Sequence, residues 1–347
     1  MYLDGITIAN ALVTSLGNNQ HRVSYCVHLP GNYKLHIRLL LINGWAGFDR
    51  ALWGSPFSIQ VTDPQELVIP TSLAPVRASE LPVCVNAYDA SYGEWVRVDA
   101  LSVAERHAWH STVLRATRDD YVWAPYLCRL LPMDKTQIRH IYTSIGQTCL
   151  MGDSLLRSLF AYFLFWSGIY DVEGLHKTGY TQTNWQLEGF NFFWWESEAN
   201  QRQFGDCVVN ASLVVRSFIE DMQAIPLTEA DLNHMLDWRG KMPDQTVPFV
   251  QMLAHYQTGD RLEAAHRNNR NIQQRNREQR ALLKGQSDGM FDIFDVSEMH
   301  LPRMVAETCD GMHVMCGQGS SPNWIDHQVV GHWEGLILAQ ILTQVPT

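Results

Sequence analysis

The most constraining feature of this 347-residue chain is a short apolar strand that runs directly into an apolar helix. Gln147–Met151 has the length and apolar character of a buried strand, and Leu155–Trp166 follows almost at once with the character of a buried helix. From about residue 138 onward, strand and helix patterns alternate, which is typical of α/β layer folds. The sequence therefore predicts an α/β domain over residues 136–347.

The other elements predicted for this domain keep the same alternation. Thr228–Trp238 reads as a helix that opens with a capping box, in which Thr228 reaches toward Asp231. The remaining predicted strands and helices are, in chain order, Phe190–Trp195, Cys207–Val209, Leu262–Leu283, Met290–Val296 and Glu334–Leu342. The last strand and the last helix are thus separated by a long loop.

The first sixty or so residues predict a small all-β module. Val23–His28 and Lys34–Leu41 carry strand-forming residues, and Pro30-Gly31-Asn32 between them is typical of a turn. A second turn at Gly54-Ser55-Pro56 leads into Phe57–Val61, which alternates like a half-buried strand. We therefore expect a β module over residues 1–65.

Residues 66–135 show several prolines and few periodic segments. We expect this stretch to be an irregular connecting segment that packs on the α/β domain. The predicted organisation is therefore a β module, a connector over residues 66–135 and an α/β domain over residues 136–347.

Composition and charge argue against two classes of partner. The net charge of −10 is the opposite of what a nucleic-acid-binding face requires. A membrane span needs roughly 18 apolar residues, whereas the longest apolar run, Leu159–Ile169, is shorter and contains Ser167 and Gly168. The first residues also lack the charged and apolar regions of a signal peptide. We expect no nucleic-acid partner and no membrane span in this chain.

Gly152-Asp153-Ser154 lies where the predicted strand ends and the predicted helix begins. A strand-to-helix turn exposes a serine hydroxyl, and the helix N-terminus stabilises the negative charge that develops in acyl transfer. The backbone N–H of Ser154 can also donate to an oxyanion. Ser154 is therefore predicted to be a catalytic nucleophile.

A nucleophilic serine needs a base, and the base needs a carboxylate to orient it. The sequence holds two D-x-x-H pairs, Asp231/His234 and Asp310/His313. The first pair lies inside the capped helix, where Asp231 already serves as a cap. The second lies in the loop after the last predicted strand, and active groups collect at the carboxyl ends of parallel strands. We predict that Asp310 and His313 are the orienting acid and the base.

Asn210 follows the predicted strand Cys207–Val209. An asparagine amide at a strand end can donate to the oxyanion of a tetrahedral intermediate. Two other interpretations stay open, a turn residue and an N-glycan acceptor, because Asn210-Ala211-Ser212 is a sequon. We predict the oxyanion role for Asn210.

Further sequence blocks accompany these residues, in a fixed order along the chain. Gly152–Arg157 reads GDSLLR, and a Trp-rich strand over Phe192–Trp195 comes next. Two earlier blocks of the form C…GxWV and YxWxPxxC are formed by Cys84 with Gly93, Glu94, Trp95 and Val96, and by Tyr121, Trp123, Pro125 and Cys128. Over about residues 80–347 this order resembles the PC-esterase branch of the SGNH (GDSL-like) hydrolase superfamily. The branch includes plant trichome-birefringence-like glycan O-acetyltransferases, the sialate O-acetyltransferase domain and neurexophilin/PC-esterase proteins.

The β module has a resemblance of its own. Its strands read PGxYxLxI and GSPFxIxV, carried by Pro30, Gly31, Tyr33, Leu35 and Ile37, and by Gly54, Ser55, Pro56, Phe57, Ile59 and Val61. This pattern is similar to the second half of a filamin-type immunoglobulin-like repeat. A complete repeat needs more residues before Met1, so we expect a truncated or degenerate module. A filamin-like module before a PC-esterase domain resembles the neurexophilin/PC-esterase arrangement.

The resemblance implies a three-layer α/β/α SGNH-type parallel-sheet domain preceded by a small all-β, Ig-like module. It implies that Ser154 is the nucleophile, His313 the base and Asp310 the orienting acid, with Arg157 at or near the oxyanion site. It also implies the secretory pathway, the Golgi or the extracellular space, although the chain itself shows no targeting signal. Cys84 and Cys128 are a candidate disulfide pair, but the sequence does not fix the connectivity.

The favoured function is a glycan O-acetyltransferase that works through an acyl-Ser154 intermediate, with an acetyl donor as co-substrate. A carbohydrate acetyl esterase on the same triad is the first alternative, because both reactions share the acyl-enzyme. A non-catalytic adhesion or signalling module is the second alternative. The expected partners are a glycan or glycoconjugate substrate and a protein that binds the Ig-like module.

Aromatic side chains and histidines complete the predicted site. Four aromatic residues are candidates for a sugar groove, namely Tyr180, Trp185, Trp194 and Trp195. The chemistry needs no bound cofactor and no metal, and the seven cysteines contain no C-x-x-C pair of the kind that holds zinc. Three histidines near the predicted base, His300, His327 and His332, are expected to be loop or surface residues.

Overall fold

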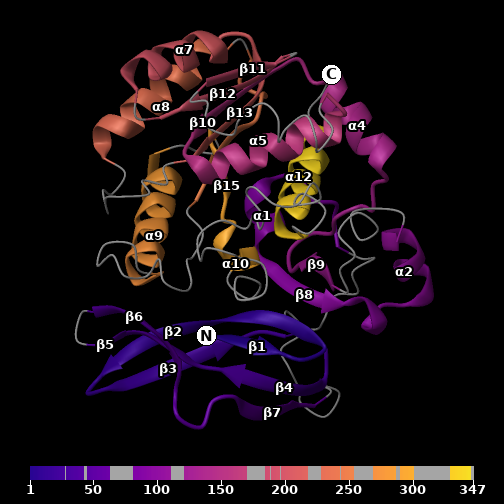
Figure 1. Cartoon of the computed structure of the whole chain (residues 1–347), viewed down its shortest axis with the longest axis vertical. Coiled ribbons are helices and arrows are strands. Elements are labelled where there is room, and N and C mark those ends of the chain that lie inside the picture. The colour runs from indigo at the N-terminus through magenta and orange to yellow at the C-terminus, as the bar shows by residue number, and fades with distance from the viewer. Residues whose placement is uncertain are drawn as a thin grey trace.

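The computed structural model describes most of the chain, in thirteen stretches. The described residues are 1–27, 29–42, 45–62, 81–110, 121–169, 184–187, 189–195, 197–217, 228–242, 244–253, 269–286, 290–300 and 329–344. They form an antiparallel sheet, a mainly parallel sheet and the helices that pack on them (Figure 1). The prediction of a mixed α/β protein is therefore confirmed.

The first sheet has seven strands, which run in the order β7-β4-β1-β2-β8-β9 with β3 paired to β2. All of these pairs are antiparallel. A separate hairpin is made by β5 (Arg38–Ile42) and β6 (Trp45–Ala51). The strands of the first sheet are β1 (Tyr2–Asp4), β2 (Thr7–Gly17), β3 (Gln20–Tyr25), β4 (Gly31–His36), β7 (Phe57–Val61), β8 (Gly93–Arg97) and β9 (Tyr121–Pro125).

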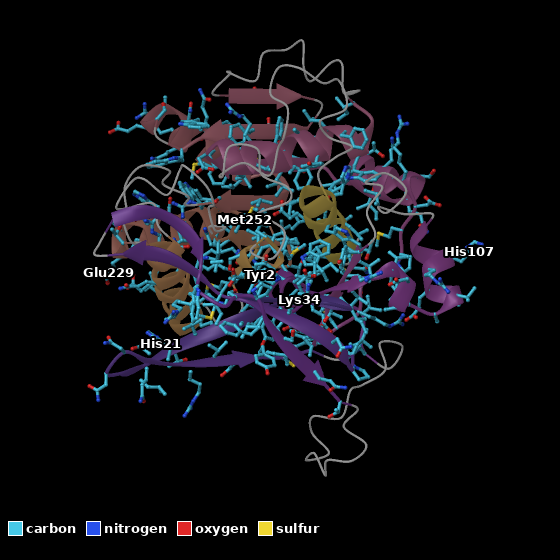
Figure 2. The ribbon with its side chains drawn as sticks, turned by 60° about the horizontal axis from the view of Figure 1, so that its bottom comes forward. Tyr2, His21, Lys34, His107, Glu229 and Met252 are labelled. Carbon is cyan, nitrogen blue, oxygen red and sulfur yellow. A yellow bond between two sulfur atoms is a disulfide. The ribbon has the colours of Figure 1, made fainter. Side chains whose placement is uncertain are left out.

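The N-terminal strands enclose a small core of their own. Leu3, Ala11, Tyr33 and Leu35 are buried against one another, as the alternation of apolar residues in a sheet with one covered face requires. Figure 2 turns this sheet forward, with Tyr2 on β1 and Lys34 on β4 near its middle and His21 near one end. The predicted all-β character of the first sixty residues is confirmed for the part that the structure describes.

The predicted connector over residues 66–135 packs on the α/β domain as expected, but the prediction that it is irregular was wrong for its described part. Residues 93–97 and 121–125 form β8 and β9, and Ile8 of β2 pairs with Trp95 of β8. The same stretch holds α1 (Ala87–Ser91) and α2 (Val103–His110). Because β8 completes the sheet that begins at residue 2, a boundary at residue 65 divides the strands of a single sheet.

The second sheet has six strands in the order β11-β12-β10-β13-β14-β15. Only β11 is antiparallel to its neighbour, and the other five strands are parallel. Numbered in chain order, these five strands lie across the sheet in the doubly wound order 2-1-3-4-5. The strands are β10 (Gln147–Gly152), β11 (Asn184–Leu187), β12 (Phe190–Trp194), β13 (Ala211–Ser217), β14 (Phe249–Met252) and β15 (Asp292–Phe294).

Two separate hydrophobic cores lie on the two faces of the second sheet. Leu150, Phe192 and Val215 pack with α4 (Lys135–Ser144), α5 (Ser154–Ser167) and α12 (Val329–Leu342). The neighbouring residues Met151 and Phe193 point the other way, as alternation along a strand requires. They pack with α7 (Glu198–Val208), α8 (Glu229–Lys241) and α9 (Asn269–Gln286). The domain is therefore a three-layer α/β/α arrangement (Figure 1).

The predicted strand Cys207–Val209 was wrong, because residues 198–208 form helix α7. Ser197 caps this helix by accepting from the N–H of Asn200. Asn200, Phe204, Cys207 and Val208 are buried, with the spacing of one helical face. This helical spacing over residues 200–208 outweighs the preference of the β-branched Val208 and Val209 for a strand.

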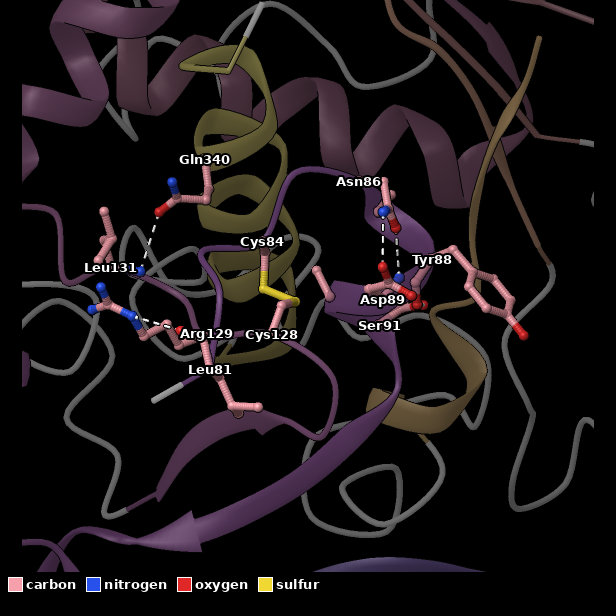
Figure 3. The surroundings of a disulfide bond; sticks show 12 residues. Leu81, Cys84, Asn86, Tyr88, Asp89, Ser91, Cys128, Arg129, Leu131 and Gln340 are labelled. Carbon is pink, nitrogen blue, oxygen red and sulfur yellow. Dashed lines mark hydrogen bonds between the residues drawn. A yellow bond between two sulfur atoms is a disulfide. The ribbon is translucent and has the colours of Figure 1, made fainter. Parts of the chain in front are cut away.

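Two disulfides join elements within the described chain. Cys84 pairs with Cys128, and Cys149 of β10 pairs with Cys207 of α7. Figure 3 shows the first bridge beside α12, where the N–H of Leu131 donates to Oε1 of Gln340 at 3.1 Å. The Cys84–Cys128 pair suggested by the resemblance is thus present in the structure.

Candidate functional site

Ser154 lies at the carboxyl end of a central strand of the parallel sheet. β10 ends at Gly152, and α5 begins at Ser154. β10 pairs with β12 on one side and β13 on the other, so the chain winds away from β10 in both directions. Ligands of doubly wound sheets bind in the crevice outside the carboxyl ends at this switch point. The predicted strand–turn–helix context of Ser154 is therefore confirmed.

The turn before Ser154 is tight enough to require glycine at position 152. A Cβ added to Gly152 would lie 2.8 Å from side-chain atoms of Leu156 and 3.3 Å from Cβ of Ser217. The first turn of α5 thus passes directly over the end of β10. No acidic residue lies in this first turn, and the buried Asp153 directly precedes it. Such a helix end favours a developing oxyanion near Ser154.

The end of β12 lies beside the same turn. Trp194 pairs with Gly152, and the N–H of Trp195 donates to the carbonyl of Gly152 at 3.2 Å. The guanidinium carbon of Arg157 lies 5.4 Å from the ring centroid of Trp194. Because Arg157 belongs to the first turn of α5, the structure brings Arg157 and Trp194 together next to Ser154.

Trp194, the last residue of β12, and Trp195, which follows it, face opposite sides of the sheet. Trp194 packs against the core under α5 and α12, whereas Trp195 packs against the core under α7 and α8. Both side chains are half-buried. Trp194 therefore lies on the α5 side of the sheet, and Trp195 lies on the opposite face.

The predicted position of Asn210 was wrong. It lies in the turn between α7 and β13 and is exposed, and β13 begins at the next residue. The start of β13 pairs with Gln147 at the start of β10, so Asn210 is at the amino edge of the sheet. The seven residues of β13 span roughly 20 Å between Asn210 and the edge that carries Ser154. This geometry removes Asn210 from the oxyanion site.

Ser217 occupies the place that Asn210 was predicted to fill. It is the last residue of β13, it is 1% exposed, and its Cβ faces Gly152 across the switch point. In the described part of the chain its Oγ has no hydrogen-bond partner. No sequence motif marks Ser217. Only the pairing of β13 with β10 reveals it.

The other predicted site residues lie partly outside the described structure. Asp310, His313 and Tyr180 are not among the described residues, and of Ser154 and Trp185 only the backbone is described. The rejected pair is well described: Asp231 forms the predicted capping box with Thr228, and His234 is exposed on α8. The predicted capping role of Asp231 is therefore confirmed.

The expectation that the nearby histidines are loop or surface residues was wrong for two of them. His300 ends α10 (Ser297–His300) and is 1% exposed. His332 in α12 is fully buried, in contact with the rings of Tyr162, Phe165 and Trp166. His327 lies outside the described residues.

A cavity of about 530 Å³ lies at the opposite edge of the sheet. Its lining includes Phe249 and Asp292, the first residues of β14 and β15. The carboxylate of Asp292 accepts from the backbone N–H groups of Ala87 at 2.5 Å and Tyr88 at 3.2 Å, and burial raises its pKa to about 6. These contacts make Asp292 a structural link to α1, and the cavity lies at the edge away from Ser154.

Among the described residues, no three His, Cys, Asp or Glu side chains lie together as a metal site requires. None of the described helices has both the length and the apolar character needed to cross a membrane.

The chain was also compared with known proteins. No family model, no curated protein and no solved structure matches it.

Proposed function

We propose that this protein transfers an acyl group, most simply acetyl, to a carbohydrate through an acyl-Ser154 intermediate. The observation that carries the proposal is the position of Ser154, which follows the central strand β10 at the switch point and begins α5. On this proposal the second domain is of the SGNH type. The strand order 2-1-3-4-5 and the helices on both faces support that assignment.

The proposed reaction has two steps on the same serine. Oγ of Ser154 attacks the carbonyl carbon of the acyl donor, His313 takes the hydroxyl proton, and Asp310 orients the imidazole. The collapse of the tetrahedral intermediate releases the donor alcohol, which receives that proton. A sugar hydroxyl then attacks the acyl-enzyme and gives its proton to His313. Collapse of the second tetrahedral intermediate releases the sugar ester, and His313 returns the proton to Oγ, which regenerates Ser154.

Groups around the turn support the stabilisation of an oxyanion. The N-terminus of α5 points its backbone N–H groups toward the switch point, and Arg157 adds a cation in the first helical turn. With Asn210 at the other edge, the hydroxyl of Ser217 is the polar side chain that β13 offers here. We assign Arg157 and Ser217 to the oxyanion side of the site.

Trp194 supports carbohydrate as the acceptor. An indole ring is a large flat apolar surface, and this one is half-buried beside Arg157 at the edge of the site. The alternative reaction, hydrolysis of a sugar acetate, uses the same acyl-enzyme with water in place of the sugar. A non-catalytic role in adhesion would need neither an accessible Ser154 nor a competent base.

A fluorophosphonate probe tests whether Ser154 is a nucleophile. The wild-type protein should be labelled, and Ser154→Ala should abolish labelling because the bond to phosphorus forms at Oγ. Ser144→Ala, an exposed serine on α4, is the control and should be labelled like the wild type. A folded wild-type protein that is not labelled would contradict both enzyme functions and favour the adhesion role.

Product analysis then separates transfer from hydrolysis. An activated acetyl ester is turned over with and without added oligosaccharide. Transfer predicts faster release of the ester alcohol with sugar present, together with an acetylated sugar in the mass spectrum. Free acetate as the sole product, at a rate that sugar leaves unchanged, would favour the esterase.

A further inference from the structure

We propose that Asn210 is the acceptor of an N-linked glycan, attached in an oxidising secretory compartment. Asn210-Ala211-Ser212 is a sequon, and the sequence contains no second triplet of the form N-x-S/T. The position of Asn210 at the amino edge of the parallel sheet leaves it outside the acyl-transfer site. The inference therefore does not rest on the proposed function.

The side chain of Asn210 is accessible to a bulky substituent. The residue is exposed in the turn between α7 and β13, and its neighbour Val209 is 42% exposed. The hydrogen bond that Asn210 makes within the turn comes from its backbone, since its N–H donates to the carbonyl of Cys207 at 3.2 Å. Conjugation of the side-chain amide leaves this bond intact. Exposed surface turns of this kind are where N-glycans are found.

The backbone on both sides of Asn210 is fixed to β10. Before the turn, Cys207 forms a disulfide with Cys149, and Nε2 of Gln147 donates to the carbonyl of Cys207 at 3.1 Å. After the turn, Ala211 is buried and pairs with Gln147. A glycan on Asn210 thus extends from a rigid turn, and the chain needs no rearrangement to carry it.

The place of the turn leaves room for a glycan. The ribbon of α7, which ends just before Asn210, and the first sheet lie at opposite ends of the view in Figure 1. The length of β13 puts roughly 20 Å between Asn210 and the edge that carries Ser154. A glycan at this position therefore avoids both the contact between the two sheets and the proposed nucleophile.

The cysteines support the compartment that this modification requires. The disulfides Cys84–Cys128 and Cys149–Cys207 are typical of proteins that mature under oxidising conditions. N-glycans are attached in such a compartment as well, and Cys207 lies only three residues before Asn210. The disulfides and the exposed sequon are separate observations that indicate the same environment.

The modification needs an oligosaccharide donor linked through a diphosphate to a lipid. Nδ2 of Asn210 forms a bond to the anomeric carbon of the donor, and the bond from that carbon to the diphosphate oxygen breaks. The diphosphate keeps the electron pair, and one amide proton is released. The hydroxyl of Ser212 completes the triplet that the transferase recognises. Ser212 is half-buried in the folded protein, which is compatible with transfer to the chain before it folds.

Mass spectrometry of the full chain, produced behind a secretion signal in cultured animal cells, tests the assignment. Treatment with an N-glycosidase should reduce the mass of the wild type by one oligosaccharide. In heavy-oxygen water the same treatment should leave an isotope-labelled aspartate at position 210. Asn210→Gln and Ser212→Ala should lose the mass change, and Ser212→Thr should keep it because threonine restores the sequon. Asn233→Gln, at an exposed asparagine of α8 outside any sequon, is the matched control and should behave like the wild type.

Secreted and cell-retained protein are both analysed, so that a variant that folds poorly is still read. An unmodified wild type in both fractions would overturn the inference. A mass change that persists in Asn210→Gln would overturn the assignment to this residue. Fluorophosphonate labelling of Ser154 is a separate measurement, so an unlabelled but glycosylated protein would contradict the proposed function alone.

Discussion

Gly152 shows how a single residue fixes the geometry of the site. A methyl group at this position would meet Leu156 at 2.8 Å and Ser217 at 3.3 Å. We expect Gly152→Ala to destabilise the fold by about 1–3 kcal/mol, as other overpacking substitutions do. It should also lower the rate of Ser154 labelling, because relief of the clash moves the first turn of α5. Urea unfolding and the labelling rate measure the two effects.

Gly240→Ala is the matched control for this substitution. Gly240 lies in α8, and nothing lies within 4 Å of its added Cβ. Alanine favours a helix over glycine by roughly 0.5–1 kcal/mol, so this variant should be slightly more stable than the wild type. Equal stability losses in the two variants would contradict the steric explanation for Gly152.

The predictable and unpredictable residues of the site differ in a physical way. Ser154 was predicted from its sequence because a local pattern, a strand followed by a helix, positions it. Ser217 carries no such pattern, since its place depends on which strand pairs with β10. Asn210 was placed at the wrong edge because Cys207 and Val208 were taken for a strand, whereas their spacing from Phe204 is helical.

At the scale of elements, segments with a clear apolar pattern were predicted well, including the short strands β7 and β12, whereas β8 and β9 were not. β10 and α5 were predicted to within two residues at each end, since each buries a nearly continuous apolar surface. β8 and β9 were missed, although both contain buried tryptophans. Neither sequence, GEWVR or YVWAP, shows the alternation of apolar and polar residues that marks β7.

Asp292 predicts a pH dependence for the contact between α1 and β15. Its pKa is raised to about 6 mainly by burial, so the folded state binds a proton more tightly than the unfolded state does. The contribution of Asp292 to stability therefore falls as the pH rises from about 4 to about 6. The size of the pKa shift limits this loss of stability to about 3 kcal/mol. Because the carboxyl is partly exposed, the loss is smaller than this limit.

Asp292→Asn tests this dependence. The amide does not titrate. As the pH rises from about 4 to about 6, the unfolding free energy of the wild type should therefore fall relative to that of the variant. Urea unfolding of both proteins at pH 4, 5, 6 and 7 gives the difference directly. A difference that is constant over the range would contradict the raised pKa.

At the scale of the whole molecule, the N-terminal strands and the α/β domain share one structural unit. Ile8 of β2 pairs with Trp95 of β8 and belongs to the same core as α5 and α12. Trp95 in turn contacts Met299 and Trp333, which flank the segment with the predicted base. The first sheet therefore contacts the second domain near the carboxyl edge of its sheet through a short series of buried contacts. An independent Ig-like module would lack them.

Ile8→Ala tests whether the two sheets unfold together. The truncation removes buried methyl groups, which costs about 2–4 kcal/mol in a well-packed core. If the sheets form one cooperative unit, the whole thermal transition should move to lower temperature, and tryptophan fluorescence and far-UV circular dichroism should report the same midpoint. Leu16→Ala on the same strand is the control and should leave the midpoint nearly unchanged, because Leu16 is 52% exposed. An early minor transition in Ile8→Ala, with the main transition unmoved, would show instead that the N-terminal strands unfold separately from the α/β domain.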